Sequence, residues 1–473
     1  MSFRHRFDPT SLREYDIRGI VGKTLTAQDA YAIGRAFGSI IARRGGTNVV
    51  IGYDGRLSSP ALESALVRGA MASGMAVTRV GCGPTPLLYF ASVTLEADGA
   101  VMVTGSHNPP DHNGFKMMLD SRPFFGRQIR DLGNLCATGD MVPETTGNVR
   151  DMDLTDAYVQ RLLDDWDGGA RALHVVWDNG HSAAGRVLAR LVQGLPGRHT
   201  ILNGEIDGHF PVHHPDPTIP ENLEHLIGTV RAEHADIGIA FDGDADRIGV
   251  VDNTGRIIWA DQLLVILARD ILCHHAGATV IADVKASQVL FDAVKRAGGN
   301  PVMWGAGHSL IKSKMAETGA LLAGEMSGHI FFADKWYGFD DALYAAVRLL
   351  GIVARLPSPL SDIWQALPVM INTPELRFAC SDTRKFAVIQ DVAERLRAAG
   401  ATVSLIDGVR VSTPDGWWLL RASNTQAMLV ARAESMTEAG LARLKAELTT
   451  QLQQSGIKAP DFSAHDPHHG CNG

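Results

Sequence analysis

The chain has 473 residues, which is enough for about three or four domains at ~150 residues each. Apolar residues make up 45% and charged residues 20% of the sequence, a globular composition that excludes a largely disordered, collagenous or coiled-coil protein. The net charge of -8 disfavours a general binder of nucleic acid or anionic membranes, but it leaves room for a small anionic ligand held by a local cluster of Arg and Lys.

Cysteine usage and the N-terminal sequence bear on the cellular compartment. The five cysteines are scattered and form no CxxC pair, which is typical of reduced thiols. Residues 1–12 contain no apolar signal-peptide core, and no apolar run approaches the ~18 residues that cross a bilayer. We therefore expect a soluble cytoplasmic protein with no nucleic-acid or membrane partner. The sequence leaves the oligomeric state open, with a monomer as the expectation.

Helix and strand signals alternate along the first three quarters of the chain. Thr26 followed by Asp29 predicts a capping box at the start of a helix. Ser59 and Pro60 are expected to be the N-cap and the first residue of another helix, which ends near Gly74. β-Branched runs predict strands over 48–51, 173–177, 236–241 and 279–282. An aspartate follows each of these strands, namely Asp54, Asp178, Asp242 and Asp283. This order is typical of α/β domains, whose ligand sites lie at the carboxyl ends of strands.

The last quarter of the chain has a different order of elements. A helix is predicted over 381–398, followed by strands over 402–405, 409–412, 417–421 and 428–433 and by a final helix from Thr437. Pro- and Gly-containing breaks lie at 141–147, 253–255, 356–359 and 372–374. The sequence therefore predicts three α/β domains, a smaller α+β domain and a disordered tail.

Three aspartates at alternate positions follow an apolar strand in a turn that contains glycine: Asp242, Asp244 and Asp246. Their charges repel one another unless a cation lies among them, and carboxylate oxygens suit a hard divalent ion such as Mg²⁺. An EF-hand is excluded because Arg247 stands at the sixth loop position, where glycine is required, and Asn253 stands at the twelfth, where glutamate is required. An exposed acidic turn remains the alternative.

Ser106 is a candidate for covalent chemistry. It lies between glycine and histidine in a segment that ends in two prolines, which predicts an exposed and well-defined turn. Lys116 follows and is placed to supply positive charge or a proton. A plain type I turn before a strand is an equally good interpretation of this motif alone.

Two further segments carry groups that suit a phosphorylated sugar. The segment 324–329 places hydrogen-bonding side chains at alternate positions, which suits vicinal hydroxyls: Glu325, Ser327 and His329. The segment 421–425 (RASNT) combines a guanidinium with backbone N–H groups, which suits an anion. A polar hairpin turn is the alternative for the segment 421–425.

In this order and spacing, the four motifs resemble those of the α-D-phosphohexomutase superfamily and are most similar to its bacterial phosphomannomutase/phosphoglucomutase group. TGSHNPP resembles the family's phosphoserine loop, DGDADR its metal loop, GEMSGH its sugar loop and RASNT its phosphate loop. Segments 13–19, 283–285 and 305–308 also match. The resemblance implies three related α/β domains with mixed sheets and a C-terminal α+β domain around a central cleft. The expected boundaries are 1–150 (phosphoserine), 151–255 (metal), 256–368 (sugar) and 369–473 (phosphate).

The resemblance also implies a reaction and a set of residues. The family interconverts hexose 1-phosphates and 6-phosphates through a hexose 1,6-bisphosphate, which is also its activator, and we expect mannose and glucose as the sugars. By resemblance, Ser106 becomes a phosphoserine and binds Mg²⁺ together with Asp242, Asp244 and Asp246. The implied catalytic residues are Ser106, Lys116, Arg18, His329 and Arg247. We expect Lys116 or His329 to carry the proton, because arginine is a poor proton donor at neutral pH.

The implied substrate contacts come from all parts of the chain. The 421–425 loop is expected to bind the phosphate that does not react, and a fourth domain that swings would let the intermediate turn end for end. The full set that the resemblance implies is Tyr15, Arg247, Lys285, Gly307, His308, Glu325, Ser327, His329, Arg421, Ser423, Asn424 and Thr425.

Three alternative functions remain. A phosphoglucosamine mutase of the same superfamily typically has glutamine where this chain has Met326. A sugar-phosphate phosphatase would use the same residues but transfer the phosphoryl group to water. A non-catalytic sugar-phosphate binding protein is disfavoured by the presence of Ser106 and the three aspartates.

Overall fold

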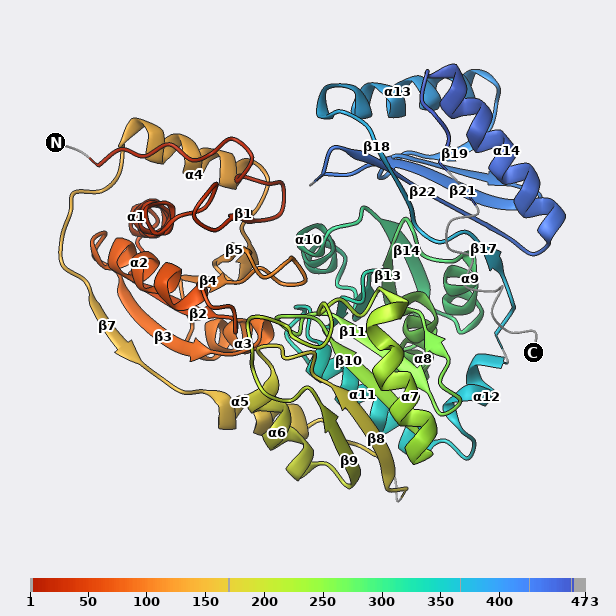
Figure 1. Cartoon of the computed structure of the whole chain (residues 1–473), viewed down its shortest axis with the longest axis horizontal. Coiled ribbons are helices and arrows are strands. Elements are labelled where there is room, and N and C mark those ends of the chain that lie inside the picture. The colour runs from red at the N-terminus through yellow and green to blue at the C-terminus, as the bar shows by residue number, and fades with distance from the viewer. Residues whose placement is uncertain (1–2, 169–170, 366, 425, 461, 463–473) are drawn as a thin grey trace.

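The chain forms four β-sheets with helices packed on them (Figure 1). The computed structural model describes residues 3–168, 171–365, 367–424, 426–460 and 462. The expected site residue Thr425 and the expected disordered tail therefore lie outside the described residues.

The first sheet has the strand order β1-β5-β4-β2-β3-β7, with β6 beside β5. It is mixed, because β4 is parallel to β2 and antiparallel to β5. The strands are β1 (Ile17–Ile20), β2 (Asn48–Tyr53), β3 (Ala76–Cys82), β4 (Gly99–Val103), β5 (His112–Leu119), β6 (Arg122–Pro123) and β7 (Asn148–Asp151). The helices are α1 (Ala27–Arg43), α2 (Ser59–Met71), α3 (Thr85–Thr94) and α4 (Arg127–Thr138).

The start of α1 confirms the predicted capping box, and the start of α2 corrects a detail. The Thr26 N–H donates to Asp29 Oδ2 at 2.7 Å, and the Asp29 N–H donates to Thr26 Oγ1 at 3.4 Å. Ser59, expected to be the N-cap of α2, is instead its first helical residue, and Ser58 is the N-cap. The Ser59 hydroxyl donates to Asp54 at 2.5 Å. Because it makes this tertiary contact, the hydroxyl does not cap the helix as the local sequence predicts.

The second and third sheets repeat the mixed pattern. The second has the order β12-β11-β10-β8-β9 and the third has the order β14-β13-β15-β16. The second contains β8 (Leu173–Asp178), β9 (Gly197–Leu202), β10 (Ile237–Phe241), β11 (Ile248–Asp252) and β12 (Ile257–Ile258), with α5 (Thr155–Leu163), α6 (Gly185–Gly194), η1 (Pro220–Leu223) and α7 (Glu224–Glu233). The third contains β13 (Thr279–Asp283), β14 (Asn300–Trp304), β15 (Leu322–Gly324) and β16 (Ile330–Phe332), with α8 (Ala260–His274), α9 (Gln288–Arg296), α10 (His308–Thr318), α11 (Ala342–Arg355) and α12 (Leu360–Gln365).

The fourth sheet is antiparallel throughout and has the order β17-β22-β21-β20-β19, with β18 beside β22. Helices α13 and α14 lie on one of its faces (Figure 1). Its elements are β17 (Ile371–Asn372), β18 (Leu376–Ala379), α13 (Asp382–Ala398), β19 (Thr402–Ser404), β20 (Val409–Thr413), β21 (Gly416–Ala422), β22 (Met428–Ser435) and α14 (Glu438–Gln454). Three mixed α/β domains and one α+β domain confirm the predicted fold class.

The hydrophobic cores divide differently from the sheets. One continuous core joins the first three domains and includes Leu88, Trp177, Leu264 and Tyr344. The fourth domain has a core of its own, built around Trp418. Apolar burial therefore fixes the first three domains relative to one another, whereas the fourth is packed chiefly on itself.

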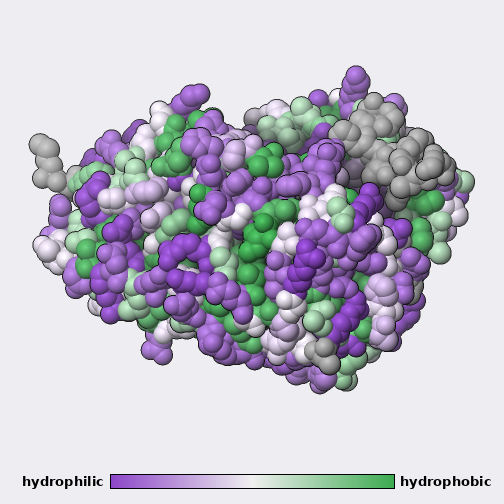
Figure 2. Space-filling view, turned by 60° about the horizontal axis from the view of Figure 1, so that its bottom comes forward, coloured by the Kyte–Doolittle hydropathy of each residue, from purple (hydrophilic) through white to green (hydrophobic). Residues whose placement is uncertain are grey.

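The hydropathy of the surface and the length of the helices bear on the expected cellular compartment. Hydrophilic residues cover most of the face in Figure 2, and hydrophobic residues gather in a band near its middle. None of the helices in the described part of the chain is long and apolar enough to cross a membrane. The cytoplasmic location, the monomeric state and the domain boundaries at 150, 255 and 368 stay predictions.

Candidate active site

Three of the sequence motifs occupy the same place in three related sheets. In each sheet a strand parallel to its neighbour is followed by the motif loop and then by an antiparallel strand. The strand pairs are β4–β5, β10–β11 and β15–β16, and the loops between them hold Ser106, the three aspartates and Glu325. The carboxyl ends of three buried strands thereby bring the three motifs together.

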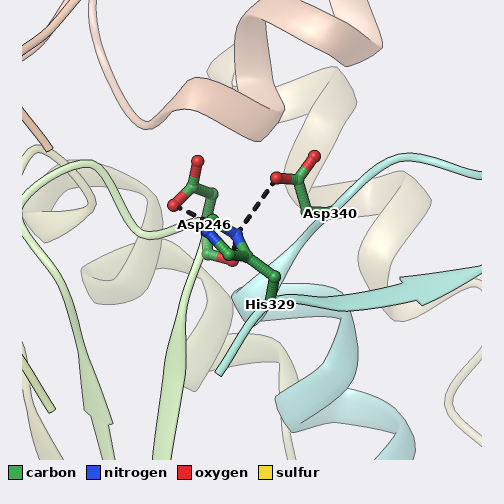
Figure 3. A group of neighbouring side chains, drawn as sticks. All are labelled: Asp246, His329 and Asp340. Carbon is green, nitrogen blue, oxygen red and sulfur yellow. Dashed lines mark hydrogen bonds and ion pairs between the residues drawn. The ribbon is translucent and has the colours of Figure 1, made fainter. Parts of the chain in front are cut away.

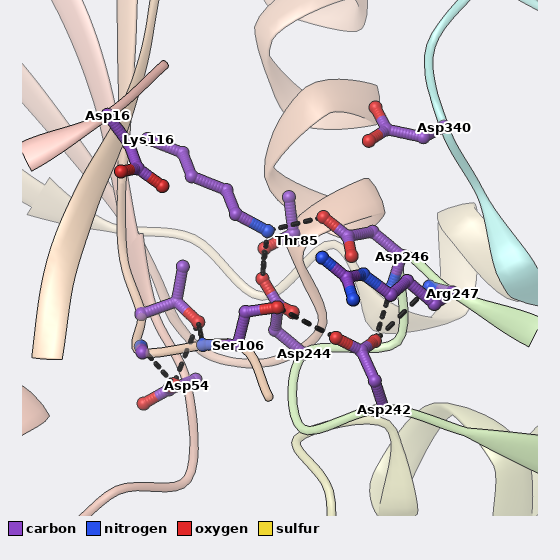
Figure 4. A network of polar contacts seen from close by, with 12 residues as sticks. Asp16, Asp54, Thr85, Ser106, Lys116, Asp242, Asp244, Asp246, Arg247 and Asp340 are labelled. Carbon is purple, nitrogen blue, oxygen red and sulfur yellow. Dashed lines mark hydrogen bonds and ion pairs between the residues drawn. The ribbon is translucent and has the colours of Figure 1, made fainter. Parts of the chain in front are cut away.

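Ser106 lies at the centre of this arrangement and faces the metal motif (Figure 4). Its side chain is buried, and its hydroxyl donates to Asp242 Oδ2 at 2.8 Å. The backbone of Ser106 has φ 48°, a left-handed conformation that is uncommon for residues other than glycine. Its N–H donates to Thr104 Oγ1 at 2.8 Å, which helps to hold this turn.

Arg56 and Asp54 hold the backbone of the loop that carries Ser106. The Arg56 side chain is 0% exposed, and its two terminal nitrogens donate at 2.5–3.0 Å to the carbonyl oxygens of Ser106, Asn108, Pro109 and His112. Asp54 lies 3.2 Å from Arg56 Nε and accepts the Gly105 N–H at 3.0 Å. The sequence singled out Asp54 as an aspartate that follows a strand but missed Arg56, for which the DGR tripeptide was the only signal.

The three aspartates form a buried set of oxygen donors: Asp242, Asp244 and Asp246 are each 0% exposed. One ligand atom from each lies within 4.8 Å of the others. Within the described part of the chain, Asp244 Oδ1 and Asp246 Oδ1 have no hydrogen-bond partner although both are buried. An unsatisfied buried carboxylate oxygen is costly, so these atoms fit a hard divalent cation.

Lys116 lies on the other side of the same carboxylates. Its ammonium donates to Asp244 Oδ2 at 2.7 Å and also to Asp246 Oδ2 (Figure 4). Burial would lower the pKa of Lys116, but the two carboxylates raise it above its usual value. Burial together with the charge of its neighbours raises the pKa of Asp242 well above the usual range. The cluster therefore has more negative charge than Lys116 alone can balance.

Arg18 and Arg247 add positive charge at the edges of this cluster. Arg18 Nε lies 2.6 Å from Asp16 Oδ2. Burial would lower the pKa of Arg18, but the charges of Asp16, Asp244 and Asp246 hold it above its usual value. The Arg247 side chain joins the second domain to the third, because its Nε donates to His329 Nε2 at 3.0 Å.

His329 lies between two domains and two carboxylates (Figure 3). Its Nδ1 is 3.1 Å from Asp340 Oδ2 and 3.5 Å from Asp246 Oδ1, whereas its Nε2 accepts from Arg247. These contacts place the ring proton on Nδ1. Lys312 donates to Asp340 Oδ1 at 2.8 Å. Burial would raise the pKa of Asp340, but Lys312 and His329 hold it well below the usual range.

The candidate sugar contacts lie in the third domain. The Gly307 N–H donates to Glu325 Oε1 at 2.6 Å, whereas Glu325 Oε2 is buried with no hydrogen-bond partner among the described residues. Burial raises the pKa of Glu325. The His308 ring stacks on His329 with 5.5 Å between centroids, and Ser327 lies in the same turn as Glu325. Gly307 has φ 139°, and a Cβ there would lie 2.6 Å from the Tyr15 ring, so only glycine fits.

The candidate phosphate contacts lie between the first, third and fourth domains. Asn424 Nδ2 donates to the Tyr15 hydroxyl at 2.5 Å, and burial raises the pKa of Tyr15 to about 12. Arg421 is buried, and the Ser423 hydroxyl accepts the Gln426 N–H at 3.1 Å. Thr425 lies outside the described residues, so its predicted contact is not described.

Lys285 reaches the same junction from the third domain. Its ammonium lies 3.0 Å from Glu375 Oε2 and 3.7 Å from Asp283 Oδ2. Burial would lower the pKa of Lys285, but the carboxylates of Glu375 and Asp283 raise it. Asp283 also accepts the Met326 N–H at 3.2 Å and so joins the Lys285 turn to the Glu325 loop. Glu375 was not singled out in the sequence.

A four-domain fold that brings a buried serine and three carboxylates able to hold a metal ion together with the loops around Glu325 and Arg421 defines the α-D-phosphohexomutase class. Models of the phosphoglucomutase/phosphomannomutase family match α/β/α domain I at residues 9–131, domain II at 156–255, domain III at 259–370 and the C-terminal domain at 375–451. The chain belongs to the phosphoglucomutase/phosphomannomutase family.

Relatives of known sequence and structure agree over nearly the whole chain. The chain is 46% identical to a phosphomannomutase/phosphoglucomutase of Pseudomonas aeruginosa over 453 residues, which are 96% of this chain and 97% of that protein. It is 45% identical to a phosphoglucomutase of Neisseria gonorrhoeae over 92% of this chain and 94% of that one. A solved structure of a family protein from Burkholderia thailandensis superposes with a TM-score of 0.90 at 43% identity, covering 96% of this chain and 99% of that one.

Proposed function

We propose that the protein interconverts hexose 1-phosphates and hexose 6-phosphates, with mannose and glucose as the sugars, through a phosphoserine and a hexose 1,6-bisphosphate. The observation that carries this proposal is the buried Ser106 hydroxyl, which lies 2.8 Å from Asp242 within a set of hard oxygen donors. The four loops then belong to a phosphoserine domain (1–150), a metal domain (151–255), a sugar domain (256–368) and a phosphate domain (369–473).

Ser106 is the proposed carrier of the phosphoryl group, and the aspartates are the proposed Mg²⁺ ligands together with a phosphoserine oxygen. The unpartnered Oδ1 atoms of Asp244 and Asp246, described above, support this assignment. When bound, the ion would neutralise charge on the oxygens of the transferred group. Arg18 and Arg247 would add to that neutralisation from the first and second domains.

His329 and Lys116 are the candidates for proton transfer. The Nδ1–H of His329 faces Asp340, which leaves Nε2 as the ring atom that can accept a proton once Arg247 moves. Lys116, whose pKa is raised, starts as a cation and is better suited to stabilising charge. These contacts favour His329 as the base.

The remaining residues would hold the sugar and its non-reacting phosphate. Glu325 and Ser327 would bind two ring hydroxyls, beside Gly307 and His308. The buried, unpartnered Oε2 of Glu325 supports a polar ligand at this position. The phosphate would be bound by Tyr15, Lys285, Arg421, Ser423, Asn424 and Thr425.

Substrate choice follows from the turning of the intermediate. Hydroxyls 3 and 4 roughly exchange places when the sugar turns over, whereas hydroxyl 2 has no equivalent partner. A site that binds hydroxyls 3 and 4 through Glu325 and Ser327 therefore discriminates poorly between the two configurations at carbon 2. Mannose and glucose differ only in that configuration. We expect kcat/KM for the two 1-phosphates to differ by less than about 100-fold, because larger ratios require a hydrogen bond to the distinguishing group.

A coupled assay with mannose 1-phosphate, glucose 1-phosphate and glucosamine 1-phosphate tests the proposal. Both hexoses should be isomerised, glucosamine 1-phosphate should be clearly poorer because of Met326, and Glu325→Ala should impair both hexoses together. A preference above ~10³-fold for one epimer would contradict the assignment of the sugar loop. Release of inorganic phosphate that matches the loss of sugar phosphate would instead identify a phosphatase.

A further inference from the structure

One residue of the third domain is bound through its backbone by both the first and the fourth domains. It belongs to Ala306, in the loop between β14 and α10. The Ala306 N–H donates to Asp407 Oδ2 at 3.0 Å, and the Ala306 carbonyl accepts from the Tyr15 hydroxyl at 2.8 Å. Asn424 of the fourth domain donates to that same hydroxyl at 2.5 Å. We call Tyr15, Ala306, Asp407 and Asn424 the junction cluster.

Asp407 also binds the candidate phosphate ligand Arg421. The Nε and Nη2 atoms of Arg421 lie 3.0 and 2.9 Å from Asp407 Oδ2, the same oxygen that accepts the Ala306 N–H. Burial would lower the pKa of Arg421, but the Asp407 carboxylate raises it above its usual value. Two contacts to one oxygen fix the plane of the guanidinium, so Asp407 determines which way Arg421 points.

The surroundings of Asp407 differ from those of an ordinary surface ion pair. The fourth domain has such a pair between Asp415 and Arg443, where Arg443 is 62% exposed and Asp415 is 30% exposed. The hydrogen bonds of that pair join Asp415 to Arg443 and to the Ser435 hydroxyl and so lie within the fourth domain. Asp407 is 14% exposed and Arg421 10%, and the same Asp407 oxygen reaches the third domain.

If the fourth domain moves away from the third, the Asp407–Ala306 bond breaks while the Asp407–Arg421 pair travels with the domain. The orientation of Arg421 relative to the sugar loop is therefore defined only in the closed arrangement, in which the Asp407–Ala306 bond is intact. A bisphosphate that turns end for end must lose and regain its contacts with Arg421, and during that time it either is recaptured or escapes.

We propose that Asp407 is a positioning residue that couples closure of the fourth domain to the orientation of Arg421, and so favours recapture of the bisphosphate intermediate over its escape. This inference rests on the proposed function. It assigns a role to a side chain outside the four motifs, in the turn between β19 and β20.

The test compares full-length wild-type protein, Asp407→Asn and the matched control Asp415→Asn. Each is phosphorylated by incubation with radiolabelled glucose 1,6-bisphosphate, which transfers one labelled phosphoryl group to Ser106 and leaves as the monophosphate. The protein is then freed of excess label and mixed with unlabelled glucose 1-phosphate, and the labelled bisphosphate found in solution per turnover is measured. Asp407→Asn keeps the size of the side chain and removes its charge. Because charge-assisted hydrogen bonds contribute substantially, it should release ~10-fold more bisphosphate than wild type. Asp415→Asn should release the wild-type amount.

A second readout separates positioning from a general loss of structure. With saturating glucose 1,6-bisphosphate added, kcat of Asp407→Asn should return to within about threefold of wild type while KM for the 1-phosphate stays raised, because recapture then no longer limits turnover. Asp407→Glu, which keeps the charge, should restore retention in part. If Asp407→Asn is recovered unfolded, Tyr15→Phe, which removes the other bond to Ala306, should give the same increase in release.

Equal release from Asp407→Asn and wild type would overturn this proposal. So would a kcat that added bisphosphate fails to restore. Failure of the proposed function looks different, because wild-type protein would then take up no label on Ser106 and convert no sugar phosphate.

Discussion

Substitution of Arg56 is the most demanding test of whether its hydrogen bonds hold the turn that carries Ser106. Replacing it by methionine in Arg56→Met keeps much of the buried volume but removes the four hydrogen bonds to loop carbonyls and the partner of Asp54. Removal of one partner from a buried charged network costs roughly 3–5 kcal/mol. For a protein of this size, that corresponds to a fall of about 5 °C in Tm.

The effect of Arg56→Met on phosphoryl transfer should be larger than its effect on stability. Ser106 adopts φ 48° in a loop that Arg56 binds at four points, and without them the turn is expected to relax. A displacement of about 1 Å at a reacting group costs on the order of 100-fold in rate. We therefore expect transfer from phosphorylated Ser106 to glucose 1-phosphate, measured by rapid quench, to slow by ~100-fold.

Arg79→Met in the same domain is the matched control. Arg79 donates two hydrogen bonds to Glu63 at 2.7 and 2.9 Å, and Glu63 is 0% exposed. The loss of Arg79 therefore also leaves a buried charge unpaired and should lower stability by roughly 3–5 kcal/mol, but it removes no bond to the Ser106 loop and should leave transfer unchanged. The reasoning is wrong if Arg56→Met transfers at the wild-type rate, or if Arg79→Met slows transfer equally.

Three other outcomes are expected. Ser106→Ala should lower kcat by at least ~10³-fold, since it removes the group that carries the phosphoryl, and intact mass should show no phosphorylation. Asp244→Asn should weaken Mg²⁺ binding by ~10-fold or more in calorimetry because a hard anionic ligand is lost; an unchanged Kd would argue against this metal site. Burial would lower the pKa of His213, but Asp178 at 3.0 Å raises it above its usual value. The ion pair between protonated His213 and Asp178 therefore stabilises the folded state fully below pH ~6.5, and this stabilisation disappears as pH rises through the raised pKa of His213. His213→Gln should therefore lower Tm more at about pH 6 than at about pH 9, and an equal loss at both would contradict the sign.

Local signals explain why much of the fold could be predicted. The run before Asp242 is a buried strand, and the capping box at Thr26 and Asp29 starts a helix, because both depend on neighbouring residues. The predicted α+β order of the last quarter is confirmed for the same reason. The prediction that Ser59 is an N-cap was wrong because its hydroxyl donates to Asp54, and no local sequence pattern indicates that contact.

The parts of the site that the sequence missed are contacts between distant segments. Arg56 binds a loop about fifty residues away, and Asp407 binds Ala306 across 101 residues. Neither arginine nor aspartate at these positions has a spacing signature, because the partner is a backbone carbonyl or N–H that any residue could supply. The chemistry-bearing groups could be read from the chain, whereas the groups that hold them in place could not.

The separate core of the fourth domain has a consequence for how the protein loses its structure. Among the described residues, a small buried apolar cluster of Val284, Trp417 and Leu419 joins the third and fourth domains, beside hydrogen bonds from Arg410 to backbone carbonyls. One core joins the first three domains, although the first also has a second core around Phe37 and Phe115, so we expect these three domains to melt as one cooperative unit and the fourth as another. Under mild denaturant, amide hydrogen exchange should therefore reach β20 and β21 before β10, giving a partly unfolded species in which the loop of Ser106 stays folded while Arg421 no longer belongs to a folded domain.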